Sequence, residues 1–182
     1  MVSPSQNALA LYVHLPWCIK KCPYCDFNSH VANHRESSAS GLPEKSYLTA
    51  LIEDLEQELL IIQKPIILRS IFFGGGTPSL LSAAFYRDLL IEVATRCQFA
   101  DDIEISLEAN PGTVDEANFI GYRQAGINRL SIGVQSFSNQ SLKKLGRIHD
   151  VSQAHRAFKV AREAGFENMY LDLLEGLGVV WV

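Results

Sequence analysis

The sequence lacks several features that would tie it to a membrane or to a charged partner. It contains no apolar run approaching the ~20 residues that cross a bilayer, and it lacks the basic start and long apolar core of a secretory signal. It also lacks an excess of positive charge. The formal net charge is −4, which gives no reason to expect a nucleic-acid backbone as partner. We therefore expect a cytoplasmic protein whose thiols are kept reduced.

Cysteine is scarce as well, but its placement is informative. Of four cysteines in 182 residues, three fall within eight residues, in the segment CIKKCPYC at 18–25. Structural disulfides are not expected in a reducing compartment, so this clustering needs another explanation. Three thiolates this close in sequence can fold onto one iron–sulfur cluster, which normally has four cysteine ligands. One iron would then stay open to a substrate or cofactor, as a catalytic metal requires.

Structural zinc is the alternative interpretation of this segment. The three cysteines would then be joined by His14, His30 or His34 as the fourth ligand. Zinc ligands more often come as two separated pairs, and the sequence has no second pair, so the spacing favours iron–sulfur. Cys97 lies on the apolar stripe of a predicted helix, and we interpret it as a buried thiol.

Short strand-like runs alternate with longer helix-like runs along the chain. The predicted strands are 11–15, 69–73, 103–109, 129–135 and 169–173. The predicted helices are about 44–63, from Ser79 or Ser82 to about 97, from Thr113 to 126, 139–145 and 151–164. This alternation predicts an α/β fold with a parallel sheet and crossover helices.

The parity of polar residues favours a barrel over an open doubly wound sheet. Glu104, Ser106 and Glu108 alternate with apolar residues in one strand, and the other strands show the same pattern. Strands of a doubly wound sheet are buried on both faces and read as continuous apolar runs. One polar face instead suits a curved sheet with helices outside and a ligand-filled interior. An ordinary α+β sheet with one wet face remains the alternative.

Three segments together resemble one enzyme family. The Cys-x-x-x-Cys-x-x-Cys motif after a first strand resembles the signature of radical S-adenosylmethionine (SAM) enzymes. The segments YVHLPWC at 12–18, FGGGTP at 73–78 and GVQSF at 133–137 narrow the resemblance. They are similar to the oxygen-independent coproporphyrinogen III oxidase family, with its branch of HemW-like heme chaperones. The resemblance spans about 11–177 and implies a partial (β/α)6 barrel, truncated here after about five strands.

The resemblance also implies roles for individual residues. Cys18, Cys22 and Cys25 would hold a [4Fe–4S] cluster, with S-adenosylmethionine as the second cofactor. The implied cofactor contacts are Tyr12, Tyr24, Gly75, Gly76, Thr77, Glu108, Gln135, Arg147 and Asp172. Three of these end strands with a single parity, where β/α barrels place their sites. His149 we predict at the surface.

Two functions of different classes follow from the resemblance. The oxidase decarboxylates two propionates of coproporphyrinogen III, whereas the chaperone binds heme and passes it to target proteins. The oxidase motif carries a further cysteine two residues beyond the third, and here that position is Phe27. This favours a HemW-like heme chaperone, with SAM, heme or porphyrin and a low-potential flavodoxin- or ferredoxin-type electron donor as partners.

The third interpretation is an inactive fragment. We expect residues 1–182 to form a radical-SAM core that is incomplete at its C-terminus, without the C-terminal domain of the family. Glu175 stands where the family usually has an aromatic residue or histidine, and Gly178 stands where it has proline. A truncated or frameshifted reading frame, or one half of a split gene, would explain this end.

Overall fold

The computed structural model describes residues 8–32, 41–113 and 116–174, so Glu175, Gly178 and His34 lie outside the described residues. The strands are β1 (Ala8–Leu15), β2 (Trp17–Cys18), β3 (His30–Val31), β4 (Ile67–Gly75), β5 (Gln98–Ala109), β6 (Arg129–Gln135) and β7 (Asn168–Leu173). The helices are α1 (Glu44–Ile62), α2 (Ala83–Ala94), α3 (Glu116–Ala125), α4 (Asn139–Lys144) and α5 (Val151–Glu163), with short 3-10 turns η1 (Pro78–Leu80) and η2 (Pro111–Thr113).

Five of these strands form one parallel sheet. Its order, β1-β4-β5-β6-β7, follows the chain, and each strand pairs with the next in parallel. A doubly wound sheet would reverse its strand order at a switch point, whereas sequential winding is the arrangement of a barrel wall. The predicted α/β fold with a partial barrel is therefore confirmed, with five strands of the wall present.

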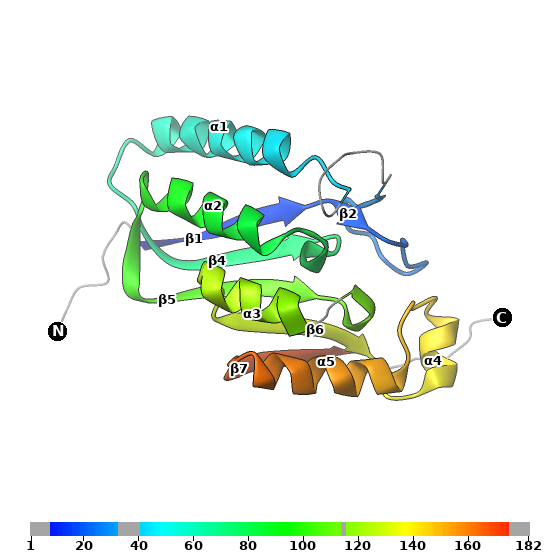
Figure 1. The fold of residues 1–182 in the computed structure, drawn as a ribbon. Helices are drawn as coiled ribbons and strands as arrows, with labels where there is room; N and C mark the ends of the chain where they lie inside the picture. Colours follow the sequence, from blue (N-terminus) through cyan, green and yellow to red (C-terminus); the bar gives the residue numbers. More distant parts are fainter. Residues whose placement is uncertain (1–7, 33–40, 114–115, 175–182) are drawn as a thin grey trace.

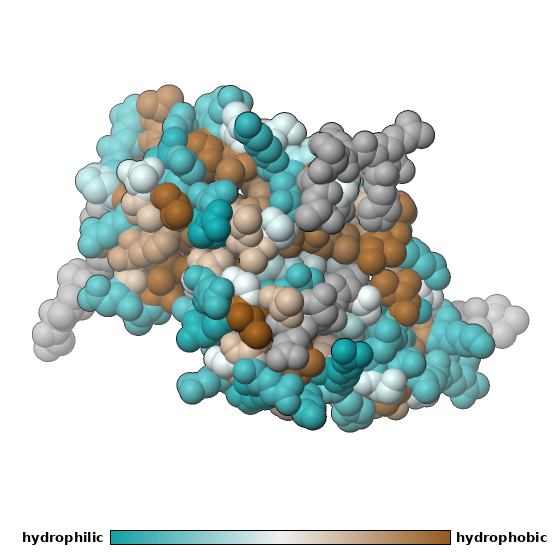
Figure 2. Space-filling model, in the orientation of Figure 1, coloured by the Kyte–Doolittle hydropathy of each residue, from teal (hydrophilic) through white to brown (hydrophobic). Residues whose placement is uncertain are grey.

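The helices α1, α2, α3 and α5 follow one another along a single face of this sheet (Figure 1). We call this the helix-covered face and the opposite one the cavity face. In Figure 2 hydrophilic side chains cover much of the helical layer, and hydrophobic ones are visible between the helices. The strand residues under the helices are buried, among them Leu15, Phe73, Leu107, Leu130 and Val134. Their neighbours in sequence point to the cavity face, as the two-residue period of a strand requires.

Two helix starts have clear local causes. The Ser82 side chain accepts a hydrogen bond from the backbone N–H of Phe85, which makes Ser82 the N-cap of α2. Helix α5 begins with a capping box formed by Asp150 and Gln153. Cys97 is buried as predicted, at 5% exposure, but the helix placement was wrong because α2 ends at Ala94.

Candidate functional site

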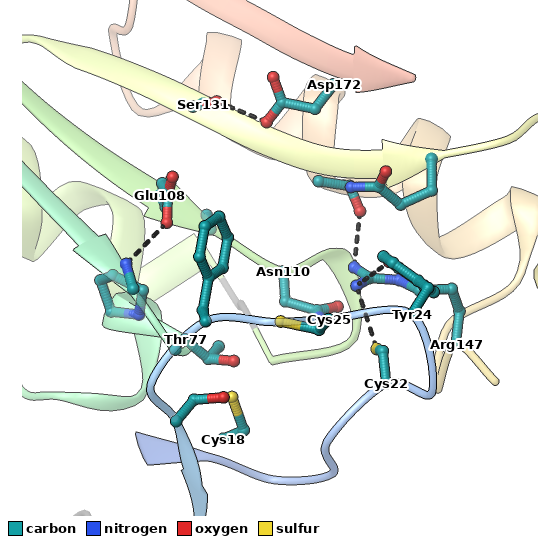
Figure 3. A pocket seen from close by; sticks show the side chains of 18 of the residues that line it. Cys18, Cys22, Tyr24, Cys25, Thr77, Glu108, Asn110, Ser131, Arg147 and Asp172 are labelled. Carbon is teal, nitrogen blue, oxygen red and sulfur yellow. Dashed lines mark hydrogen bonds between the residues drawn. The ribbon is translucent and has the colours of Figure 1, made fainter. Parts of the chain in front are cut away.

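A cavity of about 590 Å³ opens at the C-terminal ends of the strands. Its walls come from the cysteine segment, the β4–η1 turn, the ends of β5, β6 and β7, and the turn after α4 (Figure 3). Eleven of the twelve predicted site residues line it: Cys18, Cys22, Tyr24, Cys25, Gly75, Gly76, Thr77, Glu108, Gln135, Arg147 and Asp172. Residues more than 150 positions apart in sequence therefore meet at one site.

Tyr12 is the exception. It lies on the cavity face of β1 but outside the lining, with 55% of its surface exposed. Its ring stacks on that of Phe72, with centroids 6.2 Å apart, and its hydroxyl lies 3.1 Å from Nδ1 of His14. Its contact with the cofactor stays a prediction.

The cysteine segment is closed at its base by a short parallel pair, β2 and β3, which the sequence did not predict. Trp17 and Cys18 pair with His30 and Val31. Within the segment, the N–H of Cys25 donates to the carbonyl of Cys22 at 3.1 Å. The loop thus leaves the sheet and returns to it at one place, which presents its three cysteines to the same cavity.

The three cysteines all line the cavity from the same loop. Among the described residues, no three His, Cys, Asp or Glu side chains gather around a single ion position. One zinc ion would need its thiolates within about 2.3 Å of a common centre, whereas a cluster spreads its ligands over several irons. Both ring nitrogens of His14 are already engaged, by Tyr12 and by the carbonyl of Asn28 at 2.7 Å. With His14 engaged elsewhere, the three cysteines suit a cluster, whose iron atoms share the ligands between them.

Arg147 joins the cysteine segment to the end of β6. Its Nη2 donates to the carbonyl of Gly133 at 2.7 Å, and its Nη1 lies 3.3 Å from the Tyr24 hydroxyl and 3.6 Å from the Cys22 sulfur. The preceding Gly146 has φ +68, and a Cβ there would stand 2.9 Å from the ring of Pro23. Glycine at this turn lets the loop pack closely on the sheet.

The glycine turn after β4 fits tightly between two other elements. Gly75 has φ +112, a conformation that glycine adopts easily, and its N–H donates to Glu108 Oε2 at 3.2 Å. A Cβ on Gly76 would stand 2.5 Å from the carbonyl oxygen of Trp17 and 2.8 Å from that of Leu15. These two glycines bring the backbone of the turn to the cavity wall.

Two carboxylates and one amide come from the ends of β5, β6 and β7. Burial raises the pKa of Glu108, and the Asp172 carboxylate raises it further, while the Gly75 N–H and His14 act in the opposite direction. Asp172 accepts a hydrogen bond from Ser131 at 2.6 Å. Gln135 has φ +66, which is uncommon for a residue other than glycine and concentrates at functional sites.

The sequence interpretation missed several residues of the lining. They are Phe72, Asn110, Arg129, Ser131 and Tyr170. Most lie on the polar parity already visible in the strands, and Asn110 directly follows β5, so parity and strand ends were the signals that could have found them. The resemblance gave only positions that match family motifs, and these residues lie between the motifs.

The surface prediction for His149 was wrong. Only 4% of this side chain is exposed, and its Nε2 lies 3.0 Å from the carbonyl of Val134. The residue stands in a loop, which suggested solvent, but the loop packs against the sheet beside Gly112. Burial and the nearby Arg147 charge lower the pKa of His149, partly offset by the hydrogen bond to Val134.

Comparison with known proteins places this site in a family. The family model described as the radical SAM superfamily matches residues 12–178. Two curated relatives, each named heme chaperone HemW, are 47% identical over 177 residues in Haemophilus influenzae and 48% identical over 169 residues in Escherichia coli. The matches cover 96% and 93% of this chain but only 45% and 43% of those proteins. The chain thus spans less than half of the length of these relatives.

The solved structure of coproporphyrinogen III oxidase (HemN) from E. coli, described as a radical SAM enzyme, has a TM-score of 0.77 at 30% identity. It covers 92% of this chain, which matches 37% of that one. The archaeal Elp3 of Methanocaldococcus infernus shares the fold at a TM-score of 0.60 and 16% identity. Within the described residues, no helix is both long and apolar enough to span a membrane.

Proposed function

Because the chain belongs to the radical SAM superfamily, we propose that it carries the cluster- and cofactor-binding core of a HemW-type heme chaperone. The observation that carries this proposal is the meeting of three cysteines, a glycine turn and strand-end carboxylates around one cavity. Membership of the superfamily implies a [4Fe–4S] cluster and S-adenosylmethionine. Heme as cargo, a low-potential electron donor and a place in the reducing cytoplasm are parts of the proposal.

The residues divide the work of binding between them. Cys18, Cys22 and Cys25 would hold the cluster, which supplies the one-electron chemistry when bound. The glycine turn lets a cofactor with an amino group approach its backbone closely, and the Glu108 carboxylate offers that amino group an acceptor. Arg147 offers a cation for a carboxylate, since a guanidinium pairs with that group through a planar fork of donors.

The chaperone is favoured over the oxidase by one residue of the cysteine segment. Phe27 occupies the position of the further cysteine in the oxidase motif, and it lines the cavity with 60% of its surface exposed. The structural likeness to coproporphyrinogen III oxidase supports the oxidase as the second candidate. The chaperone would release its tetrapyrrole chemically unchanged, whereas the oxidase would release a decarboxylated product.

The metal content of the protein tests the core of the proposal. We expect anaerobic reconstitution with iron and sulfide to give a coloured protein with about four irons per chain. Cys22→Ala should lose the cluster while the far-UV circular dichroism stays the same, because the loop lies outside the apolar core. Cys97→Ala is the matched control and should keep the iron. One zinc per chain without iron would reject the proposal in favour of structural zinc.

Tetrapyrrole chemistry then separates the two candidates. The chaperone interpretation predicts stoichiometric binding of hemin, seen as a shift of its Soret band, and no turnover of coproporphyrinogen III with cluster, cofactor and reductant present. Decarboxylation of coproporphyrinogen III would favour the oxidase.

A further inference from the structure

We propose that a row of side chains on the cavity face is the floor of the tetrapyrrole site, and that Arg129 anchors a carboxylate of the bound ring. The row consists of Tyr12, Phe72, Ser106 and Arg129. This inference rests on the proposed function, because it names the residues that would receive its cargo. Heme and coproporphyrinogen are both flat or bowl-shaped rings that carry propionate groups.

The strand register brings these four residues into one line. Tyr12 is paired with Phe72, Phe72 with Ser106, and Ser106 with Arg129, across four adjacent strands. Adjacent strands are about 4.8 Å apart, so Phe72 and Arg129 stand roughly 10 Å apart along the row. That span suits a ring resting over the aromatic end with a propionate reaching the cation.

The two ends of the row suit the two parts of such a ligand, its flat ring and its carboxylate. The stacked rings of Phe72 and Tyr12 form an aromatic surface at one end, and aromatic faces are favoured partners for flat rings. Ser106 is 1% exposed and its hydroxyl donates to Glu104 Oε1 at 3.1 Å, so it separates the two ends of the row without itself meeting the ligand. Arg129 supplies the positive charge at the other end.

Arg129 is held in place with donors to spare. Its Nη1 donates to Glu104 Oε1 at 2.6 Å, and its guanidinium lies 4.1 Å from the centre of the Tyr170 ring. Its Nε is buried and has no hydrogen-bond partner among the described residues. A buried donor without a partner calls for one, and a carboxylate is the group that a guanidinium binds through two donors.

Tyr12 belongs both to the row and to the predicted cofactor contacts, and the other three residues of the row lie beside those contacts. Glu108 pairs with Ser131 one step further along the strands, toward their C-terminal ends. Phe72, Arg129 and Tyr170 nevertheless line the same cavity as Glu108 and the cysteines. A ring over Phe72 and Arg129 would therefore lie next to the cofactor site without occupying Glu108 or the cysteines.

A purely structural ion pair is the competing explanation of Arg129, and three variants separate the two. Arg129→Gln removes the anchor, and Glu104→Gln removes only its partner. The double variant Arg129→Gln/Glu104→Gln removes both charges, so that the Glu104 carboxylate is not left without its partner. Circular dichroism melting of the reconstituted chain monitors folding in each case.

The measurement is the dissociation constant of hemin and of hemin dimethyl ester, whose carboxylates are blocked. We expect hemin binding to weaken about 10- to 100-fold in Arg129→Gln and in the double variant. Glu104→Gln should bind hemin at least as well as the wild type, because the cation remains. The ester should bind the wild type as weakly as hemin binds Arg129→Gln, with no further loss in that variant. Phe72→Leu should weaken hemin and its ester alike.

Three results would overturn the inference. Equal hemin affinity in the wild type and both Arg129 variants, or equal affinity for hemin and its ester, would remove the carboxylate anchor while leaving the chaperone function intact. Equal losses in Glu104→Gln and Arg129→Gln would make the pair structural. A wild-type chain with iron–sulfur cluster that binds neither hemin nor its ester would overturn the proposed function and this inference together.

Discussion

The two faces of the sheet divide stability and function between them, although the same strands build both. Phe72 and Phe73 show the division, since they are consecutive residues of β4. Phe73 is 0% exposed and packs edge-on against Tyr86, with ring centroids 4.9 Å apart. Phe72 points the other way, into the cavity lining. A shift of one residue therefore separates a core position from a site position.

This division explains why a parallel sheet here tolerates charged side chains. Parallel strands are usually buried on both sides and apolar throughout. Here Glu104, Glu108 and Arg129 occupy one face because that face borders a cavity, and the apolar burial is concentrated under the helices. Substitutions on the two faces should therefore differ in kind: one set changes the free energy of unfolding, the other changes binding.

The largest effect is expected at Phe73. Phe73→Ala would empty a fully buried ring from the centre of the apolar cluster, and such truncations cost about 3–5 kcal/mol of the free energy of unfolding. Urea denaturation monitored by circular dichroism measures the loss as a lower midpoint. This is a large part of the stability of a domain of this size.

Phe72→Ala is the matched control for the same measurement. It deletes the same ring from the neighbouring residue, but from the cavity face, where no packed layer closes over it in the described part of the chain. We expect a loss of less than about 1.5 kcal/mol. Similar losses for the two variants would show that the cavity face also carries core packing, and the comparison would fail.

A smaller effect is expected where the chain passes from β4 to the site. Gly76→Ala would place a Cβ against the carbonyl oxygens of Trp17 and Leu15, which belong to backbone and cannot swing aside. Overpacking of this kind costs about 1–3 kcal/mol. It should also lower the iron bound per chain, because Trp17 adjoins Cys18 in the strand that closes the cysteine segment.

Gly165→Ala provides the control for this variant. Gly165 has φ +89, but a Cβ there would meet nothing within 4 Å. It should cost about 1 kcal/mol through backbone strain alone and leave the iron content unchanged. Iron loss in Gly165→Ala would mean that general destabilisation controls how much iron the chain binds, and not the close approach of Gly76 to Trp17 and Leu15.

The sequence was sufficient to predict the features that depend on the two-residue alternation of strands and on the glycines that end helices. The alternation in β5 and β6 predicted which side chains face the cavity, and Gly126 and Gly165 marked the ends of two helices. These signals are local, because strand parity and left-handed helix ends depend only on neighbouring residues. The predicted site residues came from motifs, and the structure brings nearly all of them together.

Features that depend on long-range packing were missed. The β2–β3 pair involves two residues per strand, too few to leave a periodic pattern. The Arg129–Glu104–Tyr170 group joins three strands across the sheet, and its members are separated by up to 66 positions. No single segment contains the information that places such groups side by side, and the same holds for the buried His149.

The smallest effect is expected at His149, a titratable side chain that is only 4% exposed. Its pKa is lowered in the folded state by burial and by the Arg147 charge, so the unfolded chain takes up the proton first as pH falls. The free energy of unfolding should therefore be independent of His149 above its ordinary value of 6.5 and should decrease below it. His149→Gln can keep a donor for the Val134 carbonyl but cannot titrate, so its urea midpoint should fall less between pH 7 and pH 5 than that of the wild type. Parallel midpoints over that range would show that folding does not lower the pKa of His149, despite the burial of its side chain.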